Sequence, residues 1–134
     1  MTTVREPYKI LIVDDDKTFL KLLSSELSSK DEHFVVETAR SGKECLQKVK
    51  RFKPNLVLLD IGMDGMNGLV TLRFIKSIDP STLVYFLSGR SVEFLREAVG
   101  MVPADGYFTK TQFVASLTSD QSLEMILKTG KLNT

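Results

Sequence analysis

Short apolar runs alternate along the chain with longer stretches in which apolar residues recur every three or four positions. The short runs are typical of strands that are buried on both faces of a parallel sheet. The spacing in the longer stretches is typical of amphipathic helices that pack one side on a sheet. Strands are expected at residues 10–13, 34–38, 56–59, 83–87 and 106–109, and helices near 17–29, 41–52, 69–78, 91–101 and 123–127.

Capping and stop signals support several of these boundaries. Ser41 followed by Glu44 forms a capping box, a pattern that satisfies free backbone N–H groups at the start of a helix. The helix that they open should end before Pro54, because the residue before a proline disfavours the helical conformation. Pro80 and Pro103 should end the two later helices in the same way.

The order of these elements predicts an α/β fold. Alternating strands and helices with right-handed crossovers give a doubly wound parallel sheet of about five strands. Residues 1–134 should form a single domain with its core at about residues 9–128. Residues 129–134 are expected to be a tail or the start of a linker.

Charge and composition narrow the expected partners and location. The chain has 18 basic and 17 acidic residues, a balance that gives no reason to expect direct binding to nucleic acid or to a membrane. The single cysteine, Cys45, excludes an internal disulfide and fits a reducing compartment. The first residues lack the apolar stretch of a signal peptide, and no segment approaches the roughly 20 apolar residues that span a bilayer. We therefore expect a cytoplasmic protein.

Polar residues suited to handling a phosphoryl group follow four of the predicted strands. They are Asp14, Asp15 and Asp16 after the first strand, Asp60 after the third, Ser88 after the fourth and Lys110 after the fifth. In open α/β sheets, ligands bind outside the carboxyl ends of the strands. These side chains should therefore converge on one site.

The acidic residues at this edge predict a magnesium site. Carboxylates gathered together repel one another, which raises their pKa values unless a cation neutralises them. Magnesium prefers hard oxygen ligands and uses one or two carboxylates. We expect Asp15 and Asp60 to be direct ligands of Mg²⁺, Asp14 to act through a water molecule, and the backbone carbonyl of Gly62 to complete the protein's share.

Asp60 is the candidate nucleophile, because it stands alone at its strand end and an aspartate can form an aspartyl-phosphate. The metal and the Lys110 ammonium can stabilise negative charge on a transferring phosphoryl group, and the Ser88 hydroxyl can bond one of its oxygens. Asp16 is interpreted as an acidic residue near a helix N-terminus, without a part in this chemistry.

At these residues the chain resembles the receiver domain of two-component response regulators. The resemblance runs from about residue 9 to residue 113 and rests on the acidic pair after the first strand, on Asp60 at the phosphoacceptor position, and on Ser88 and Lys110. Met63 and Gly68 also fit the family's loop.

Three features depart from the family pattern. Asp64 and Thr111 stand where family members usually carry proline. The Lys110–Thr111 peptide should therefore be trans or strained, because a cis bond before a residue other than proline costs about 2.5–4 kcal/mol. The stretch from residue 112 to residue 122 also looks longer than the family's usual connection to its last helix.

The resemblance implies both a fold and a function. The fold would be flavodoxin-like, with strand order 2-1-3-4-5. The chain would accept a phosphoryl group on Asp60 from a sensor histidine kinase or a histidine phosphotransfer protein, with Mg²⁺ as cofactor. It would catalyse only its own phosphorylation and dephosphorylation, and so would not be an enzyme with an external substrate.

The resemblance also implies a switch. Tyr107 sits where the family often places an aromatic switch residue, and we expect it in a solvent-facing rotamer from which it turns when Ser88 moves. The switch would change the binding of a downstream protein to a face made by residues 91–101, residues 106–109 and the last helix.

Two other functions stay open. Residues 13–18 match the strand-end D-x-D-x-T motif of haloacid-dehalogenase-type phosphatases, which would make Asp14 the nucleophile and Asp16 the acid-base. That family needs a further acidic motif, and only Asp120 and Glu124 follow Lys110. The other alternative is a pseudo-receiver, a protein-binding module in which the two missing prolines mark the loss of phosphorylation.

Overall fold

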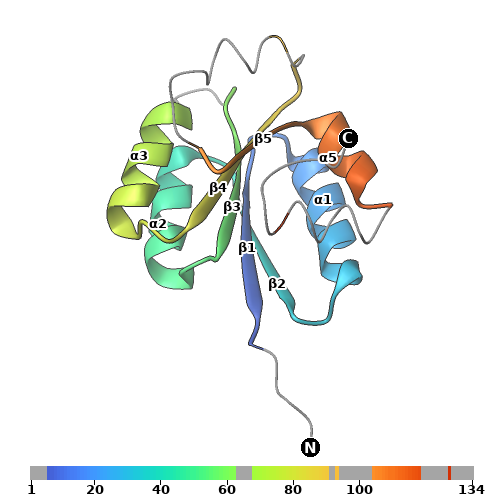
Figure 1. Cartoon of the computed structure of the whole chain (residues 1–134), viewed down its shortest axis with the longest axis horizontal. Helices are drawn as coiled ribbons and strands as arrows, with labels where there is room; N and C mark the ends of the chain where they lie inside the picture. The colour runs from blue at the N-terminus through green and yellow to red at the C-terminus, as the bar shows by residue number, and fades with distance from the viewer. Residues whose placement is uncertain (1–5, 63–67, 91–92, 94–103, 119–126, 128–134) are drawn as a thin grey trace, which may run out of the picture.

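The structure is a computed structural model that describes residues 6–62, 68–90, 93, 104–118 and 127. Within these residues, helices and strands follow one another in an α/β arrangement (Figure 1). The elements are β1 (Tyr8–Val13), α1 (Lys17–Lys30), β2 (Phe34–Ala39), α2 (Gly42–Phe52), β3 (Leu56–Asp60), α3 (Gly68–Ile78), β4 (Leu83–Ser88), β5 (Gly106–Thr109) and α5 (Lys110–Ser116).

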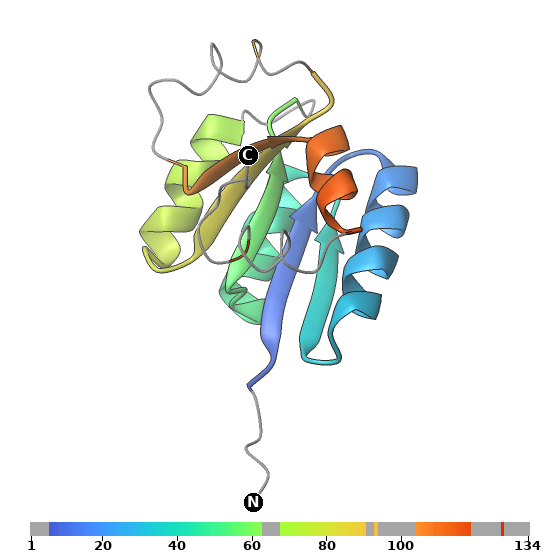
Figure 2. The same ribbon diagram turned by 45° about the vertical axis from the view of Figure 1, so that its right-hand side comes forward.

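The described strands form one parallel five-stranded sheet in the order β2-β1-β3-β4-β5. β1 pairs with β2 on one side and with β3 on the other. The chain therefore adds β2 at one side of β1, and then adds β3, β4 and β5 in turn at the other side. α1 and α5 lie on one face of the sheet, and α2 and α3 lie on the opposite face (Figures 1 and 2). The doubly wound sheet and the flavodoxin-like strand order are therefore confirmed.

Two apolar clusters hold the helices against the sheet. Successive side chains of a strand point to opposite faces, so Ile10 and Ile12 of β1 belong to one cluster, while Leu11 and Val13 belong to the other. The first cluster includes residues of α1 and α5, and the second includes residues of α2 and α3. The strands inside the sheet are covered on both sides, which explains why the sequence shows continuous apolar runs there.

Side-chain caps begin α1 and α2. Asp16 Oδ1 accepts hydrogen bonds from two backbone N–H groups in the first turn of α1. Ser41 Oγ accepts a hydrogen bond from the Glu44 N–H at 3.1 Å, as predicted. The Glu44 carboxylate accepts instead from the Arg40 N–H at 3.3 Å, one residue before the partner that a capping box would use.

The segment after β5 differs from the prediction. α5 begins directly at Lys110, where the sequence predicted a long connection up to the last helix. The Thr109 hydroxyl accepts a hydrogen bond from the Gln112 N–H at 3.0 Å, and the Gln112 side chain accepts one from the Thr109 N–H at 3.1 Å. Phe113 is fully buried in the first cluster. The prediction was wrong because it overlooked this capping box and the apolar anchor that follows it.

Several predictions lie outside the described residues. They concern the loop with Met63 and Asp64, the helix at residues 91–101 apart from residue 93, most of the helix at residues 123–127, and the tail at residues 129–134. Of the last helix, only Leu127 is described; its carbonyl accepts a hydrogen bond from the Tyr85 hydroxyl at 3.1 Å. Among the described residues, none of the helices combines the length and the apolar character that a membrane span requires.

Gly68, the first residue of α3, packs against the chain just beyond β3. A Cβ atom at Gly68 would come within 3.0 Å of Ile61 Cα, so the absence of a side chain allows the helix to approach. The start of α3 therefore lies close to the chain just beyond β3, which ends at Asp60.

Candidate functional site

The carboxyl ends of the strands bring the predicted polar residues to one edge of the sheet. Asp14 follows β1 and Asp60 ends β3, its neighbour in the sheet. Ser88 ends β4 opposite Thr109, the last residue of β5, so Lys110 follows at the same edge. Asp14, Asp60 and Ser88 are only 1%, 8% and 2% exposed.

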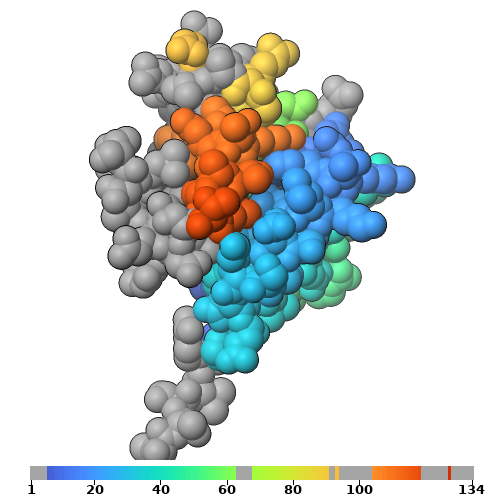
Figure 3. Space-filling view, turned by 90° about the vertical axis from the view of Figure 1, so that its right-hand side faces the viewer, coloured from blue at the N-terminus to red at the C-terminus, as the bar shows by residue number. Residues whose placement is uncertain are grey.

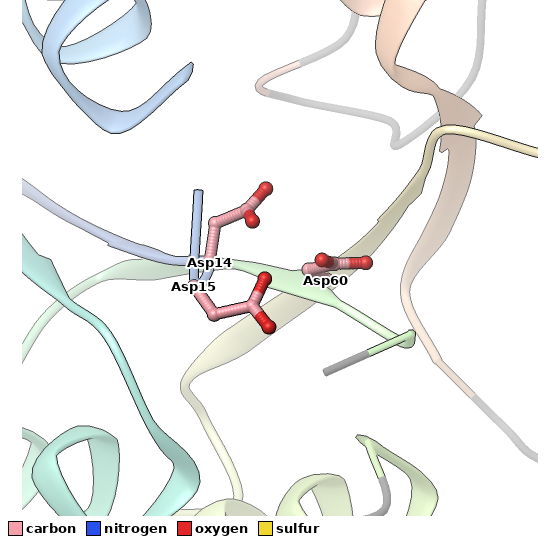
Figure 4. Close-up of side chains that lie close together, drawn as sticks. All are labelled: Asp14, Asp15 and Asp60. Carbon is pink, nitrogen blue, oxygen red and sulfur yellow. The ribbon is translucent and has the colours of Figure 1, made fainter. Parts of the chain in front are cut away.

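Three carboxylates form a compact cluster at this edge. One oxygen each from Asp14, Asp15 and Asp60 lies within 4.8 Å of the other two. Figure 4 shows Asp14 and Asp15 on the chain at the end of β1, beside Asp60 at the end of β3. Asp14 and Asp60 are buried, and Asp15 is exposed to solvent. Hard oxygen donors gathered in this way fit Mg²⁺, an ion that binds through one or two carboxylates and usually keeps several water molecules.

Gly62 lies directly beside Asp60. Its backbone N–H donates a hydrogen bond to Asp60 Oδ1 at 3.0 Å. A Cβ atom at Gly62 would lie 3.6 Å from the same oxygen, which is an ordinary contact distance, so the backbone there can carry a side chain. The expected role of the Gly62 carbonyl as a metal ligand stays a prediction.

Lys110 lies between two carboxylates. Its Nζ atom is 2.5 Å from Asp14 Oδ2 and 3.7 Å from Asp60 Oδ2. The other oxygen of Asp14 accepts a hydrogen bond from the Asp16 N–H at 3.0 Å. The Lys110–Thr111 peptide is trans. Lys110 therefore reaches the carboxylates although Thr111 replaces the proline that receiver domains usually carry at this position.

Burial dominates the electrostatics of Asp60. The pKa of Asp60 is raised to about 6, with burial as the largest cause. The charge of Asp14 also raises this pKa, while the hydrogen bond from the Gly62 N–H and the charge of Lys110 lower it. Burial alone would lower the pKa of Lys110. The hydrogen bond to Asp14 and the negative charges of Asp60 and Asp14 outweigh burial, so the pKa of Lys110 is raised and its ammonium stays charged. A further cation would therefore favour the ionised form of Asp60.

Ser88 and Tyr107, the expected switch residues, have partners in the backbone. Ser88 Oγ accepts a hydrogen bond from the Arg90 N–H at 2.9 Å, and its own hydrogen can still be donated. Tyr107 is 38% exposed; its hydroxyl accepts a hydrogen bond from the Ala104 N–H at 3.0 Å, and its ring centroid lies 6.1 Å from that of Phe86. The expectation of a solvent-facing Tyr107 is therefore correct only in part, because the ring packs against β4.

Phe19 lies at the site but was not identified from the sequence. Its ring centroid lies 4.5 Å from Lys110 Nζ, within the range of a cation–π contact. The available signal was an aromatic residue in the first helical turn after an acidic run. We interpreted Phe19 only as part of the apolar face of α1, since neither its spacing nor its type indicated that a lysine from the other end of the chain lies over it.

The observed role of Asp16 weighs against the phosphatase alternative. Asp16 Oδ1 accepts hydrogen bonds from the Thr18 and Phe19 N–H groups at 3.0 and 3.2 Å, so this carboxylate caps α1. It is also not a member of the carboxylate cluster found among the described residues. Asp120 and Glu124, the other acidic residues of that alternative, lie outside the described residues.

The family model described as the response regulator receiver domain matches residues 10–120. A protein-glutamate methylesterase/protein-glutamine glutaminase of Methanococcus maripaludis is 32% identical over 111 residues, covering 72% of this chain and 30% of that protein. A protein of the same description from Bacillus licheniformis is 41% identical over 76 residues, covering 57% of this chain and 21% of that protein.

A solved structure gives the same picture. The N-terminal domain of a response regulator/sensory box/GGDEF three-domain protein from Carboxydothermus hydrogenoformans superimposes with a TM-score of 0.71 at 31% identity. The superposition covers 90% of this chain and 94% of that one. By contrast, the chain spans only about a fifth to a third of the length of the two curated relatives.

Proposed function

The chain belongs to the family of response regulator receiver domains, and from this premise we propose that it accepts a phosphoryl group on Asp60 from a phosphohistidine donor. The proposal is supported above all by the position of Asp60. Its carboxylate is buried at the end of β3, with oxygens of Asp14 and Asp15 within 4.8 Å and Lys110 Nζ at 3.7 Å. A nucleophile, a candidate metal cluster and a fixed cation thus share one small site.

The transfer exchanges one bond to phosphorus for another. A carboxylate oxygen of Asp60 forms the new P–O bond while the P–N bond to the donor's histidine breaks. The departing imidazole nitrogen keeps the electron pair of that bond and takes up a proton. The pKa of Asp60 near 6 keeps most of this carboxylate ionised at neutral pH, as attack on phosphorus requires.

Asp14, Asp15 and Asp60 would hold Mg²⁺, together with the Gly62 carbonyl. When bound, Mg²⁺ supplies positive charge that neutralises the phosphoryl oxygens. The rest of the chemistry falls to the chain's own residues. Lys110 presents a charged ammonium beside Asp60, and Ser88 can donate its hydroxyl hydrogen to a phosphoryl oxygen.

The proposed output is a change in partner binding. The donor would be a sensor histidine kinase or a histidine phosphotransfer protein, and the downstream protein would bind a face that includes β5 and Tyr107. We propose further that residues 1–134 act as one receiver unit in the cytoplasm and modify only themselves. The methylesterase and glutaminase activities named for the relatives belong to those longer proteins and are not proposed for this chain.

Incubation with acetyl phosphate and Mg²⁺, followed by intact-mass measurement, tests the proposal. We expect one phosphoryl group on the wild-type chain, none on Asp60→Asn, and continued modification of Asp16→Asn. Turnover of phosphate esters that depends on Asp14 and survives in Asp60→Asn would support the phosphatase alternative. A wild-type chain that acquires no phosphoryl group under conditions that label a known receiver would support the pseudo-receiver.

A further inference from the structure

The beginnings of α1 and α5 lie beside each other at the site, and a side-chain cap fixes each of them. Asp16 caps α1, and Thr109 caps α5 through its capping box with Gln112. Leu20 of α1 and Phe113 of α5 are buried in the same apolar cluster. Figure 3 shows α5 lying against α1 on this face of the molecule. The first turn of α1 and the first turn of α5 are therefore held in fixed positions relative to each other.

Phe19 and Lys110 meet between these two helix starts. Lys110 Nζ lies 4.5 Å from the centroid of the Phe19 ring. The same ammonium has Asp14 Oδ2 within hydrogen-bonding distance and Asp60 Oδ2 just beyond it, at 3.7 Å. The ring is therefore an apolar but electrostatically attractive partner of the ammonium.

We propose that Phe19 is a positioning residue, which keeps the Lys110 ammonium in the site while it passes from Asp14 to a phosphoryl oxygen on Asp60. This inference rests on the proposed function. A lysine side chain has a flexible four-carbon stem and can take many rotamers, so a bond to Asp14 alone would hold the ammonium only while that bond lasts. The attraction of a ring face does not depend on one donor–acceptor line, so it persists while the ammonium exchanges the Asp14 carboxylate for a phosphoryl oxygen.

A purely structural role for Phe19 makes different predictions. Phe19 also packs against the first apolar cluster, so its truncation would lower the free energy of unfolding whether or not the ring acts on Lys110. Phe34 of β2 provides a matched control. It is partly buried against the same cluster, and among the described residues its ring pairs with Tyr8, which is not part of the site. Phe34→Leu therefore makes the same chemical change as Phe19→Leu away from the ammonium.

The first readout is the NMR signal of the Lys110 ε-methylene protons in the unphosphorylated protein. An aromatic ring face over the ammonium shifts these protons upfield through its ring current. Phe19→Leu should remove this shift, Phe19→Tyr should keep it because the ring remains, and Phe34→Leu should leave it unchanged. The measurement needs neither the metal nor a phosphoryl donor.

The second readout is the rate at which acetyl phosphate and Mg²⁺ phosphorylate Asp60. Phe19→Leu should slow this reaction about three- to tenfold, the range expected for the loss of one partly buried cation–π contact. Phe19→Tyr should restore the rate to within about twofold of the wild type. Phe34→Leu should react at the wild-type rate even where its unfolding free energy falls as far as that of Phe19→Leu.

The outcomes separate this inference from the proposed function. If Phe19→Leu keeps the upfield shift, or is phosphorylated as fast as Phe34→Leu, Phe19 does not position Lys110 for the transfer. If the wild-type chain takes up no phosphoryl group, the proposed function is wrong, and with it the kinetic part of the inference. The ε-methylene shift then decides alone whether Phe19 holds the ammonium of Lys110.

Discussion

Lys110 Nζ lies 2.5 Å from Asp14 Oδ2 and 3.7 Å from Asp60 Oδ2. The lysine is therefore hydrogen-bonded to one carboxylate of the acidic cluster and only adjacent to the proposed phosphoacceptor. One cation thus reduces the repulsion between two buried carboxylates. A metal ion held by the same carboxylates would share Asp14 with the lysine. We therefore expect metal binding and phosphorylation to change the partners of Lys110.

Magnesium should stabilise the folded chain. The three carboxylates are gathered together only in the folded state, so Mg²⁺ should bind that state alone. At about 100 times its dissociation constant, Mg²⁺ should raise the free energy of unfolding by about 2.7 kcal/mol. Asp15→Asn should abolish this effect and should raise the stability of the metal-free protein, because it removes one repelling charge. Thermal unfolding with Mg²⁺ and with EDTA measures both effects.

Asp16→Asn is the matched control for that experiment. It makes the same chemical change one residue later, and asparagine caps a helix as well as aspartate does. The control should keep the full Mg²⁺-dependent shift in melting temperature. A shift that survives in Asp15→Asn, or that disappears in Asp16→Asn, would show that the ligands are assigned wrongly.

The metal-free protein should become more stable as the pH falls through 6. The pKa of Asp60 is raised from 3.8 to about 6 in the folded state, mainly by burial, so the folded state binds a proton between these pH values while the unfolded state does not. The free energy of unfolding should rise by about 1 kcal/mol between pH 7.5 and pH 5. Urea denaturation in EDTA measures this dependence. Asp60→Asn should flatten it; an equally steep dependence in that variant would assign the proton to another group.

Ser88 should couple the phosphoryl group to Tyr107. A phosphoryl group on Asp60 brings up to two negative charges and three acceptor oxygens. The Ser88 hydroxyl can donate a hydrogen bond to one of these oxygens by leaving its present position beside the Arg90 N–H. Ser88→Ala should be phosphorylated more slowly and should show a much smaller chemical-shift change at Tyr107 when beryllofluoride replaces the phosphoryl group. NMR spectra with and without beryllofluoride provide the comparison.

Ser77→Ala is the control for Ser88→Ala. Ser77 lies exposed on α3, where its hydroxyl donates a hydrogen bond to the Phe74 carbonyl. This variant should respond to beryllofluoride as the wild type does. If Tyr107 shifts equally in all three proteins, the signal reaches it by a route that does not involve Ser88.

Gly62 and Arg90 should set the lifetime of the phosphoryl group. Gly62 offers no side chain to position an attacking water, and Arg90 can bind or screen phosphoryl oxygens. Gly62→Asn should change the dephosphorylation rate several-fold with little effect on stability, since a side chain at residue 62 meets Asp60 at ordinary contact distance. Decay of labelled protein after removal of the donor gives the rate. Equal rates in wild type, Gly62→Asn and Arg90→Ala would contradict this assignment, and Arg73→Ala on α3 provides a remote control.

The sequence was sufficient for the parts of the fold that depend on local patterns. The buried strands appear as continuous apolar runs because both faces of the sheet are covered, and the carboxyl ends of parallel strands necessarily meet at one edge. The sequence therefore predicts that Asp14, Asp60, Ser88 and Lys110 lie together. Their roles in phosphoryl transfer remain proposals.

The contacts that the sequence did not reveal join residues far apart in the chain. The cation–π contact of Phe19 with Lys110 depends on the packing of α1 against α5, and neither residue alone indicates it. The early start of α5 was a local signal that we overlooked, because the pattern from Thr109 to Gln112 is a capping box. The partners of Tyr107 depend on how the chain enters β5, which sequence periodicity does not specify.

Borohydride trapping identifies which aspartate carries the phosphoryl group. An aspartyl-phosphate is an acyl phosphate, which borohydride reduces, so a phosphorylated aspartate becomes homoserine and can be located by peptide mass spectrometry. After treatment with acetyl phosphate and Mg²⁺, we expect homoserine at position 60 and unmodified aspartate at positions 14, 15 and 16. Homoserine at position 14 with intact Asp60, or no homoserine in a chain that has gained a phosphoryl group, would show that Asp60 is not the phosphoacceptor.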